Sequence, residues 1–383
     1  RGEVQETRLL RGLIHSRAKL SYGGVQEYYD RPAESPLAGQ GYSECLELLR
    51  EVGLLRLDLA RERDVVQFNR HEIDVHTDPD GVRLAIRGQR RNDCSLYNEQ
   101  ISLLCNTEGA RLLIRETGRP VVQPVFRVHE APPDAARDHL QRVISRLVEL
   151  HRLQAETWTW RRGEESLAEF MDRLPQEAQH ARLRQAIERQ ILLCNQRSMF
   201  SAEPGQHYAL RVDAYSRFSS PMREIVGIFT HKEALEGLGM EKQGGSAEDD
   251  EAVREKIIHR ANCSKSLQRN LEKRCLKLAV DQLLRGDLLQ PTAERRPRKA
   301  TILGMSHNRV YVQMDSPPVE LKIYLDDLAE ALDEKLKVDE DEVRMASAGH
   351  GLELRVGDGV LLRTHSYDEK RGRWLLVPEL MPV

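Results

Sequence analysis

The most constraining feature of this sequence is a change of pattern at residues 288–298, a stretch with Pro291, Pro297 and three arginines that is typical of a linker. Before it, apolar residues recur mainly at the three- and four-residue spacing of amphipathic helices. After it come five short β-like runs, over 300–305, 309–313, 320–324, 359–363 and 374–377. Such a tail predicts a small barrel of the OB or S1 type, and the fold class expected for the whole chain is α+β.

The part before the linker is expected to be a mixed, mainly helical body. Helices are expected over 21–29, 43–63, 95–116, 133–154, 167–171, 179–195, 221–235 and 250–284, and strand-like runs over 7–15, 65–76, 82–87 and 207–211. Two of the strand-like runs flank Asp78-Pro79-Asp80-Gly81. Its paired carboxylates suggest a metal site, but the tetrad is more typical of a tight turn. Trp158 and Trp160 are expected to be packing anchors rather than a base-stacking platform.

Composition narrows the class of protein. Charged residues make up 31% of the 383 residues and hydrophobic residues 40%, a balance typical of globular proteins, and no apolar stretch approaches the length of a membrane span. The six cysteines show neither zinc-site spacing nor a disulfide framework, so most are expected to be small buried hydrophobes. These features favour a reducing, intracellular location, with the cytoplasm expected and the nucleus as the alternative.

The net charge of −3 argues weakly against nucleic-acid binding, but the basic residues are clustered. The expected late helix carries Arg254, Lys256, Arg260, Lys265, Arg269, Lys273, Arg274 and Lys277. Such a face is usually only solvated. The alternative is a channel wall that follows single-stranded RNA, with Lys265, Arg269 and Lys273 as candidate contacts.

The segment most informative about chemistry runs from His207 to Arg223. Its pattern predicts a strand that turns into a helix, with Ser219 and Ser220 at the cap and Pro221 in the first helical position. A helix start presents free backbone N–H groups that can bind a phosphate, and Arg223 in its first turn could add a two-pronged contact. An ordinary capped helix with a solvated arginine explains the same residues equally well.

This segment resembles the signature of the RNB family of 3′→5′ exoribonucleases, which includes RNase II and RNase R. That signature pairs H-[FY]-[GA]-L with Y-x-H-F-T-S-P-I-R-R-Y-x-D-L-x-x-H-R, and the matching positions are His207-Tyr208-Ala209-Leu210, Tyr215, Phe218, Ser220-Pro221, Arg223 and His231. Further runs match in the family's order: Ser16–Tyr22, Arg91-Asn92-Asp93, Leu103–Asn106, Phe126–Pro132 and Arg197-Ser198-Met199. The implied domains are an RNB portion over 1–288, a basic linker over 289–298 and an S1-like barrel over 299–383.

The resemblance implies metal-dependent hydrolysis of single-stranded RNA to nucleoside 5′-monophosphates. Arg223 stands at the family's phosphate-contacting arginine and is the candidate catalytic residue. The candidate RNA contacts are Tyr208, Arg217 and Ser220, in addition to Lys265, Arg269 and Lys273 on the late helix. The family's Mg²⁺ ions are held by an aspartate-rich motif expected upstream of this sequence, so no metal ligand is assigned within it.

Departures from the signature keep a second function open. Glu224 replaces the second arginine, Ile225 the tyrosine, Gly227 the aspartate and Lys232 the final arginine. A degenerate RNB module would bind RNA or a protein partner without cutting it. The variants also resemble the RNB region of the vertebrate helicase-with-zinc-finger proteins, which implies helicase modules in the same polypeptide.

Overall fold

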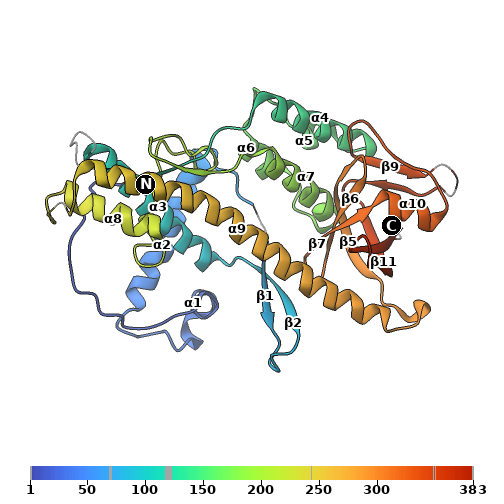
Figure 1. The fold of residues 1–383 in the computed structure, drawn as a ribbon, viewed down its shortest axis with the longest axis horizontal. Coiled ribbons are helices and arrows are strands. Elements are labelled where there is room, and N and C mark those ends of the chain that lie inside the picture. The colour runs from blue at the N-terminus through green and yellow to red at the C-terminus, as the bar shows by residue number, and fades with distance from the viewer. Residues whose placement is uncertain are drawn as a thin grey trace. The chain divides into compact units, whose positions relative to one another are not determined.

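A computed structural model of the chain describes residues 2–68, 71–116, 123–242, 244–347, 349 and 351–381. The chain divides into two compact units (Figure 1). The first unit is made of Arg1–Val66, Arg91–Ala131 and Gln196–Arg269, and the second of Gln67–Arg90, Pro132–Asn195 and Asn270–Val383. Within the described residues, no helix combines the length and the apolar character needed to cross a bilayer.

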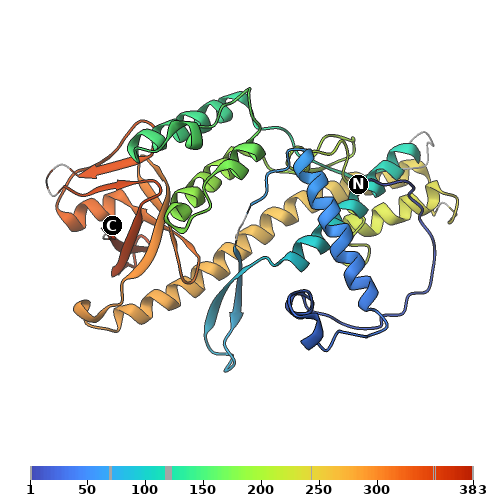
Figure 2. The same ribbon diagram turned by 180° about the vertical axis from the view of Figure 1, so that it is seen from behind.

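The first unit is built around one central helix. Its elements are α1 (Tyr22–Asp30), η1 (Pro32–Glu34), α2 (Ser43–Glu62), α3 (Asp93–Glu116), β3 (Phe126–Val128), β4 (Met199–Ser201), η3 (Tyr208–Leu210), α8 (Ile225–Gly237) and the beginning of α9 (Ala247–Leu288). Helix α3 packs against α1, α2 and α8, and β3 pairs with β4 (Figures 1 and 2). A core cluster of Ala110, Leu113, Phe126, Ala214, Phe218 and Ala234 joins α3 and α8 to the segment before α8.

The second unit combines helices with most of the strands. Its elements are β1 (His71–Thr77), β2 (Leu84–Arg90), α4 (Asp134–Leu150), α5 (Ala155–Trp158), α6 (Leu167–Arg173), η2 (Ala178–His180), α7 (Ala181–Cys194), the rest of α9, η4 (Thr292–Glu294), β5 (Arg298–Ser306), β6 (Arg309–Met314), β7 (Glu320–Tyr324), α10 (Leu325–Leu332), β8 (Leu336–Val338), β9 (Arg344–Ser347), β10 (Glu353–Arg355), β11 (Gly359–Asp368) and β12 (Arg373–Leu380).

Five antiparallel strands form the main sheet, in the order β12-β11-β5-β6-β7. Its two edge strands, β12 and β7, also approach each other, and the guanidinium carbon of Arg373 lies 3.9 Å from the centroid of the Tyr324 ring. The sheet therefore curls toward closure. Along the chain, α10 lies between β7 and β11, the third and fourth strands of this sheet in sequence order, so the sheet has the arrangement of a partly open OB-type barrel. Strands β8–β10 form a separate three-stranded sheet.

Helix α7 lies against this barrel (Figure 2). Gln190 Nε2 donates to the carbonyl of Leu303 on β5 at 2.8 Å. Arg189 binds the Glu320 carboxylate on β7 through two N–H groups, both at 2.9 Å, and its guanidinium lies over the Tyr311 ring on β6. The helix is thus tied to three neighbouring strands from a chain segment more than a hundred residues away.

The structure confirms the strands expected after the linker, although α10 and the sheet β8–β10 were not predicted. The 78–81 tetrad is a turn, with Gly81 at φ +70° and Asp78 Oδ1 accepting from two backbone N–H groups. Trp158 and Trp160 are buried.

Four expectations about local structure were wrong. Residues 7–15 form no strand, although all are described. Residues 207–211 form a 3₁₀ turn instead of a strand, because Arg211 adopts a left-handed conformation at φ +51°. The helix expected from Pro221 begins later, as described below. Cys45, Cys105 and Cys263 are exposed, since they lie on outer faces of helices rather than in the core.

Candidate phosphate-binding site

The segment between η3 and α8 is held by one side chain of α3. Asn106 is fully buried, and its Oδ1 accepts from the backbone N–H groups of Phe218 and Ser219 at 2.7 and 2.8 Å. Its Nδ2 donates to the Tyr215 hydroxyl at 2.8 Å and to Ser219 Oγ at 3.1 Å. A single amide therefore makes four hydrogen bonds to residues 215–219, which we call the 215–219 loop.

Helix α8 does not begin at Pro221. The Ser219 N–H group is satisfied by Asn106, and residues 221–223 form a turn before α8 starts at Ile225 with Glu224 as its N-cap. A Cβ on Gly227 would lie 2.3 Å from the Ser220 carbonyl oxygen, so glycine is what lets α8 approach the loop this closely. The expected phosphate cradle of a helix start at Pro221 is therefore absent, and Arg223 lies outside the helix.

Arg223 is exposed at the end of this turn. Its Nε lies 3.4 Å from Ser220 Oγ, a long hydrogen bond, while Ser220 itself is only 2% exposed. The guanidinium is therefore oriented by a buried hydroxyl but retains most of its donors. This arrangement suits contact with an incoming phosphate.

Arg217 and Glu224 form a two-pronged ion pair across the same turn. Arg217 Nε and Nη2 donate to the two carboxylate oxygens of Glu224 at 2.8 and 2.7 Å. The hydrogen bond from Arg217 lowers the pKa of the Glu224 carboxyl. Both side chains remain partly open to solvent, at 23% and 36% exposure.

Lys265 on α9 adds a third cation beside Arg217. Its Nζ is enclosed, has no hydrogen-bond partner among the described residues, and lies 4.2 Å from the centroid of the Phe200 ring. Burial, together with the nearby charges of Arg127 and Arg217, lowers the pKa of Lys265 to about 8. Arg127, on β3, is itself largely buried and donates to Ser198 Oγ at 3.0 Å. We call Arg127, Arg217 and Lys265 the cationic cluster.

Two histidines beside the cluster are structural. His129 Nε2 lies 2.8 Å from the Gln196 carbonyl and its Nδ1 accepts from the Ala209 N–H at 3.2 Å, so both ring nitrogens are bonded to the backbone. Burial is the main cause that lowers the pKa of His207 to about 3, and electrostatic interactions with His129 and Arg127 add to it. The His207 ring is therefore not available as a proton carrier near neutral pH.

Three acids among the described residues lie close enough to share a metal ion: Glu233, Glu236 and Asp250. However, Lys232 Nζ binds all three carboxylates, at 2.9, 3.0 and 2.8 Å. Because an ammonium group already occupies the position between these carboxylates, the group does not fit a divalent cation. It joins α8 to the start of α9 instead.

A sequence profile of the family described as "RNB domain" matches residues 1–234, more than half of the chain. The chain belongs to the RNB domain family. Ribonuclease R of Aquifex aeolicus is 23% identical over 378 residues, which cover 97% of this chain and 49% of that protein. The chain thus spans about half the length of this curated relative.

Solved structures of similar fold confirm the α+β fold. Mycoplasma genitalium RNase R in complex with ribose methylated single-stranded RNA matches with a TM-score of 0.77 at 14% identity, over 94% of this chain and 53% of that one. Yeast Ssd1, described as a pseudonuclease, matches with a TM-score of 0.50 at 14% identity, over 91% of this chain and 38% of that one. At this identity the likeness concerns the fold alone.

The structure brings some of the predicted site residues together and places others elsewhere. Arg217, Ser220 and Arg223 lie together around Glu224, and Lys265 lies close enough to Arg217 for their charges to interact. Arg269 is exposed and bonds to the Lys265 carbonyl at 3.1 Å. These residues all belong to the first unit.

The two remaining predicted residues lie in other surroundings. Tyr208 has one ring face covered by the guanidinium of Arg211 at 4.3 Å. Lys273 belongs to the second unit, where it lines a pocket of about 540 Å³ with Arg189 and Tyr311.

Sequence reasoning gave no role to Asn106 or Arg127. Both fall within runs that matched the family, Leu103–Asn106 and Phe126–Pro132, and that coincidence was the signal available. Their roles depend on contacts with residues about a hundred positions away.

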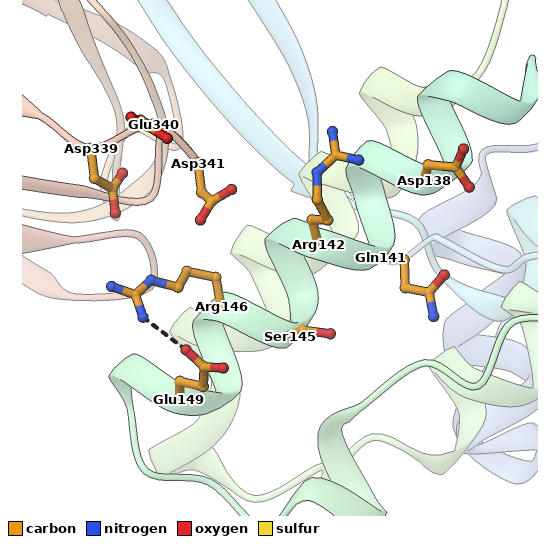
Figure 3. A pocket seen from close by; sticks show the side chains of 9 residues that line it. All are labelled: Asp138, Gln141, Arg142, Ser145, Arg146, Glu149, Asp339, Glu340 and Asp341. Carbon is orange, nitrogen blue, oxygen red and sulfur yellow. Dashed lines mark hydrogen bonds and ion pairs between the residues drawn. The ribbon is translucent and has the colours of Figure 1, made fainter.

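A larger pocket in the second unit has the wrong charge for RNA. It measures about 700 Å³ and lies between α4 and the acidic turn Asp339-Glu340-Asp341 (Figure 3). Its lining holds five carboxylates but only two arginines, Arg142 and Arg146, and Arg146 already donates to Glu149 at 2.8 Å. This negative surface would repel phosphates.

Proposed function

We propose that this RNB region forms part of a 3′→5′ exoribonuclease that hydrolyses single-stranded RNA to nucleoside 5′-monophosphates within a longer protein. The observation that carries the proposal is the oriented, exposed Arg223 beside a cationic cluster that faces the Glu224 carboxylate. Arginine donors in this position suit the non-bridging oxygens of a phosphodiester. Similarity to ribonuclease R supports the same reaction class.

In this proposal Arg223 contacts the phosphate at the cleaved bond, and the buried Ser220 hydroxyl orients its guanidinium. The 215–219 loop holds both residues in place through Asn106. Mg²⁺ would activate water and stabilise the leaving oxygen, as in other metal-dependent nucleases. No described residue is assigned as its ligand, because Lys232 Nζ already occupies the position between the acids that lie close together. We therefore expect the 383-residue chain alone to lack nuclease activity even with Mg²⁺.

A second candidate function is a degenerate RNB module that binds RNA without cutting it. The specific observation in its favour is Glu224, which places a carboxylate on Arg217 where the family signature has a second arginine. Helicase modules in the same polypeptide, as the motif variants suggest, are compatible with either function.

The test follows 3′-labelled single-stranded RNA with the full-length protein and Mg²⁺. Arg223→Ala should lower turnover by about 10²-fold while RNA affinity stays within a few-fold, because the contact strengthens in the transition state. Arg31→Ala, which removes an exposed arginine of the same unit, is the control. RNA binding without hydrolysis by the parent protein would favour the degenerate module. Equal losses of binding and turnover would assign Arg223 to ground-state binding.

A further inference from the structure

The Glu224 carboxylate is hydrogen-bonded to Arg217 and lies close enough to Lys265 for their charges to interact. It faces the three cations of the cationic cluster, and Arg223 also acts on it. The local balance therefore stays positive even with Glu224 ionised. An anion with two oxygens in one plane would match the donors of Arg217 in the way that Glu224 does.

We infer that the Glu224 carboxylate occupies a phosphate-binding position on Arg217, and that an RNA phosphate must displace it to bind there. This inference rests on the proposed RNA binding, whose affinity the Glu224 carboxylate would lower. Glu224 thus acts as a built-in competitor of the substrate.

Exchange at this position is physically accessible. The ion pair is partly exposed, and an exposed pair of this kind contributes little net stability, because each partner regains water when it separates. Ser220 Oγ also lies within reach of Glu224, so the carboxylate retains a partner beside the turn when Arg217 is released. Lys265 Nζ is enclosed and contributes through its charge rather than by direct contact.

The competing explanation is that the pair is only a clamp. Glu224 is the N-cap residue of α8, where a negative charge favours the helix. A clamp predicts that neutralising Glu224 destabilises the fold and leaves RNA affinity unchanged or lower. Competition predicts a gain in affinity instead.

The test compares Glu224→Gln with Glu203→Gln in binding a fluorescent 12-nucleotide single-stranded RNA across a salt series. Both variants remove one negative charge from the same unit, but Glu203 is exposed and lies outside the ion pair. Relative to Glu203→Gln, Glu224→Gln should bind about three- to tenfold more tightly at low salt. The slope of log affinity against log salt should steepen by about 0.7, because Arg217 then gains one phosphate without releasing a carboxylate.

Two further variants keep the result interpretable. Arg217→Gln in the Glu224→Gln background should erase the gain, and a gain that persists there would overturn the inference. Glu224→Asp keeps the charge at the helix start but shortens its reach, so it should give an intermediate gain. It also serves if Glu224→Gln does not fold.

Failure of the inference is distinguishable from failure of the proposed function. If the parent chain binds RNA and the two glutamine variants behave alike, the competition is refuted while RNA binding stands. If no variant binds RNA, the proposed function fails, and pyrophosphate replaces RNA as the probe. Greater thermal stabilisation of Glu224→Gln than of Glu203→Gln by pyrophosphate would then support the anion position, and equal stabilisation would overturn it.

Discussion

Asn106→Ala should be among the most damaging single substitutions in the first unit. The change removes one acceptor shared by the Phe218 and Ser219 N–H groups and two donor contacts, to Tyr215 and Ser219. Phe218 is buried, and its N–H keeps only a longer bond to the Ser216 carbonyl at 3.3 Å, whereas Ser219 is only half-buried and water can partly replace its bond. An unsatisfied buried group costs about 1–3 kcal/mol, and the loss of all four hydrogen bonds should lower the free energy of unfolding by about 3–5 kcal/mol.

That loss is a large share of the roughly 5–15 kcal/mol by which domains are stable. Urea unfolding of the parent chain, Asn106→Ala and Asn98→Ala would measure it. Asn98 is the matched control, because it lies on the same helix and makes one exposed bond, to the Tyr22 hydroxyl at 2.9 Å. We expect less than about 1 kcal/mol for Asn98→Ala. A loss below about 1 kcal/mol for Asn106→Ala as well would refute the idea that this amide holds the loop.

Two further predictions concern the same region. Because the pKa of Lys265 in the folded chain is about 8, below its usual 10.5, the unfolding free energy should rise as pH increases from about 8 to 10.5. Lys265→Met should abolish that rise and stabilise the chain at pH 7 by about 1–2 kcal/mol. This value is smaller than the pKa difference alone would give, because the side chain is not fully buried. Unchanged pH dependence in urea unfolding would contradict the prediction. Gly227→Ala should destabilise by about 1–3 kcal/mol because its methyl group would meet the Ser220 carbonyl. Gly286→Ala, in open space on α9, should instead stabilise by up to about 1 kcal/mol, and similar effects of the two changes on thermal unfolding would argue against the close approach.

Local sequence patterns predicted those parts of the fold whose causes are local. The alternation over 320–324 corresponds to β7 as predicted, and Ser21 caps α1 through a hydrogen bond from Gly24 N–H. The start of α8 could not be predicted in this way. Ser219, Ser220 and Pro221 have the composition of a helix cap, but residues 221–223 form a turn, and the loop before them is held by Asn106, a long-range partner that no local window contains.

In the candidate site, too, features with local causes could be predicted and features with long-range causes could not. Arg223 could be selected from its place in the family signature, and its proximity to Ser220 follows from their spacing. The pairing of Arg217 with Glu224 depends on a turn in place of a helix, so helical spacing would have placed them differently. The role of Arg127 depends on β3 being brought beside the loop, where its backbone N–H donates to the Tyr215 carbonyl at 2.8 Å.

The attachment of α7 to the barrel has a consequence for protein synthesis. Gln190 and Arg189 leave the ribosome well before β5 and β7, and the barrel's last strand, β12, ends at Leu380. At roughly 5–20 residues per second, α7 waits on the order of 10–40 s for the completed barrel. During that interval its apolar residues, including Leu183, Ile187 and Ile191, can pack only against earlier elements such as α4 and not against β5. The nascent second unit should therefore be a chaperone client until translation has passed β12.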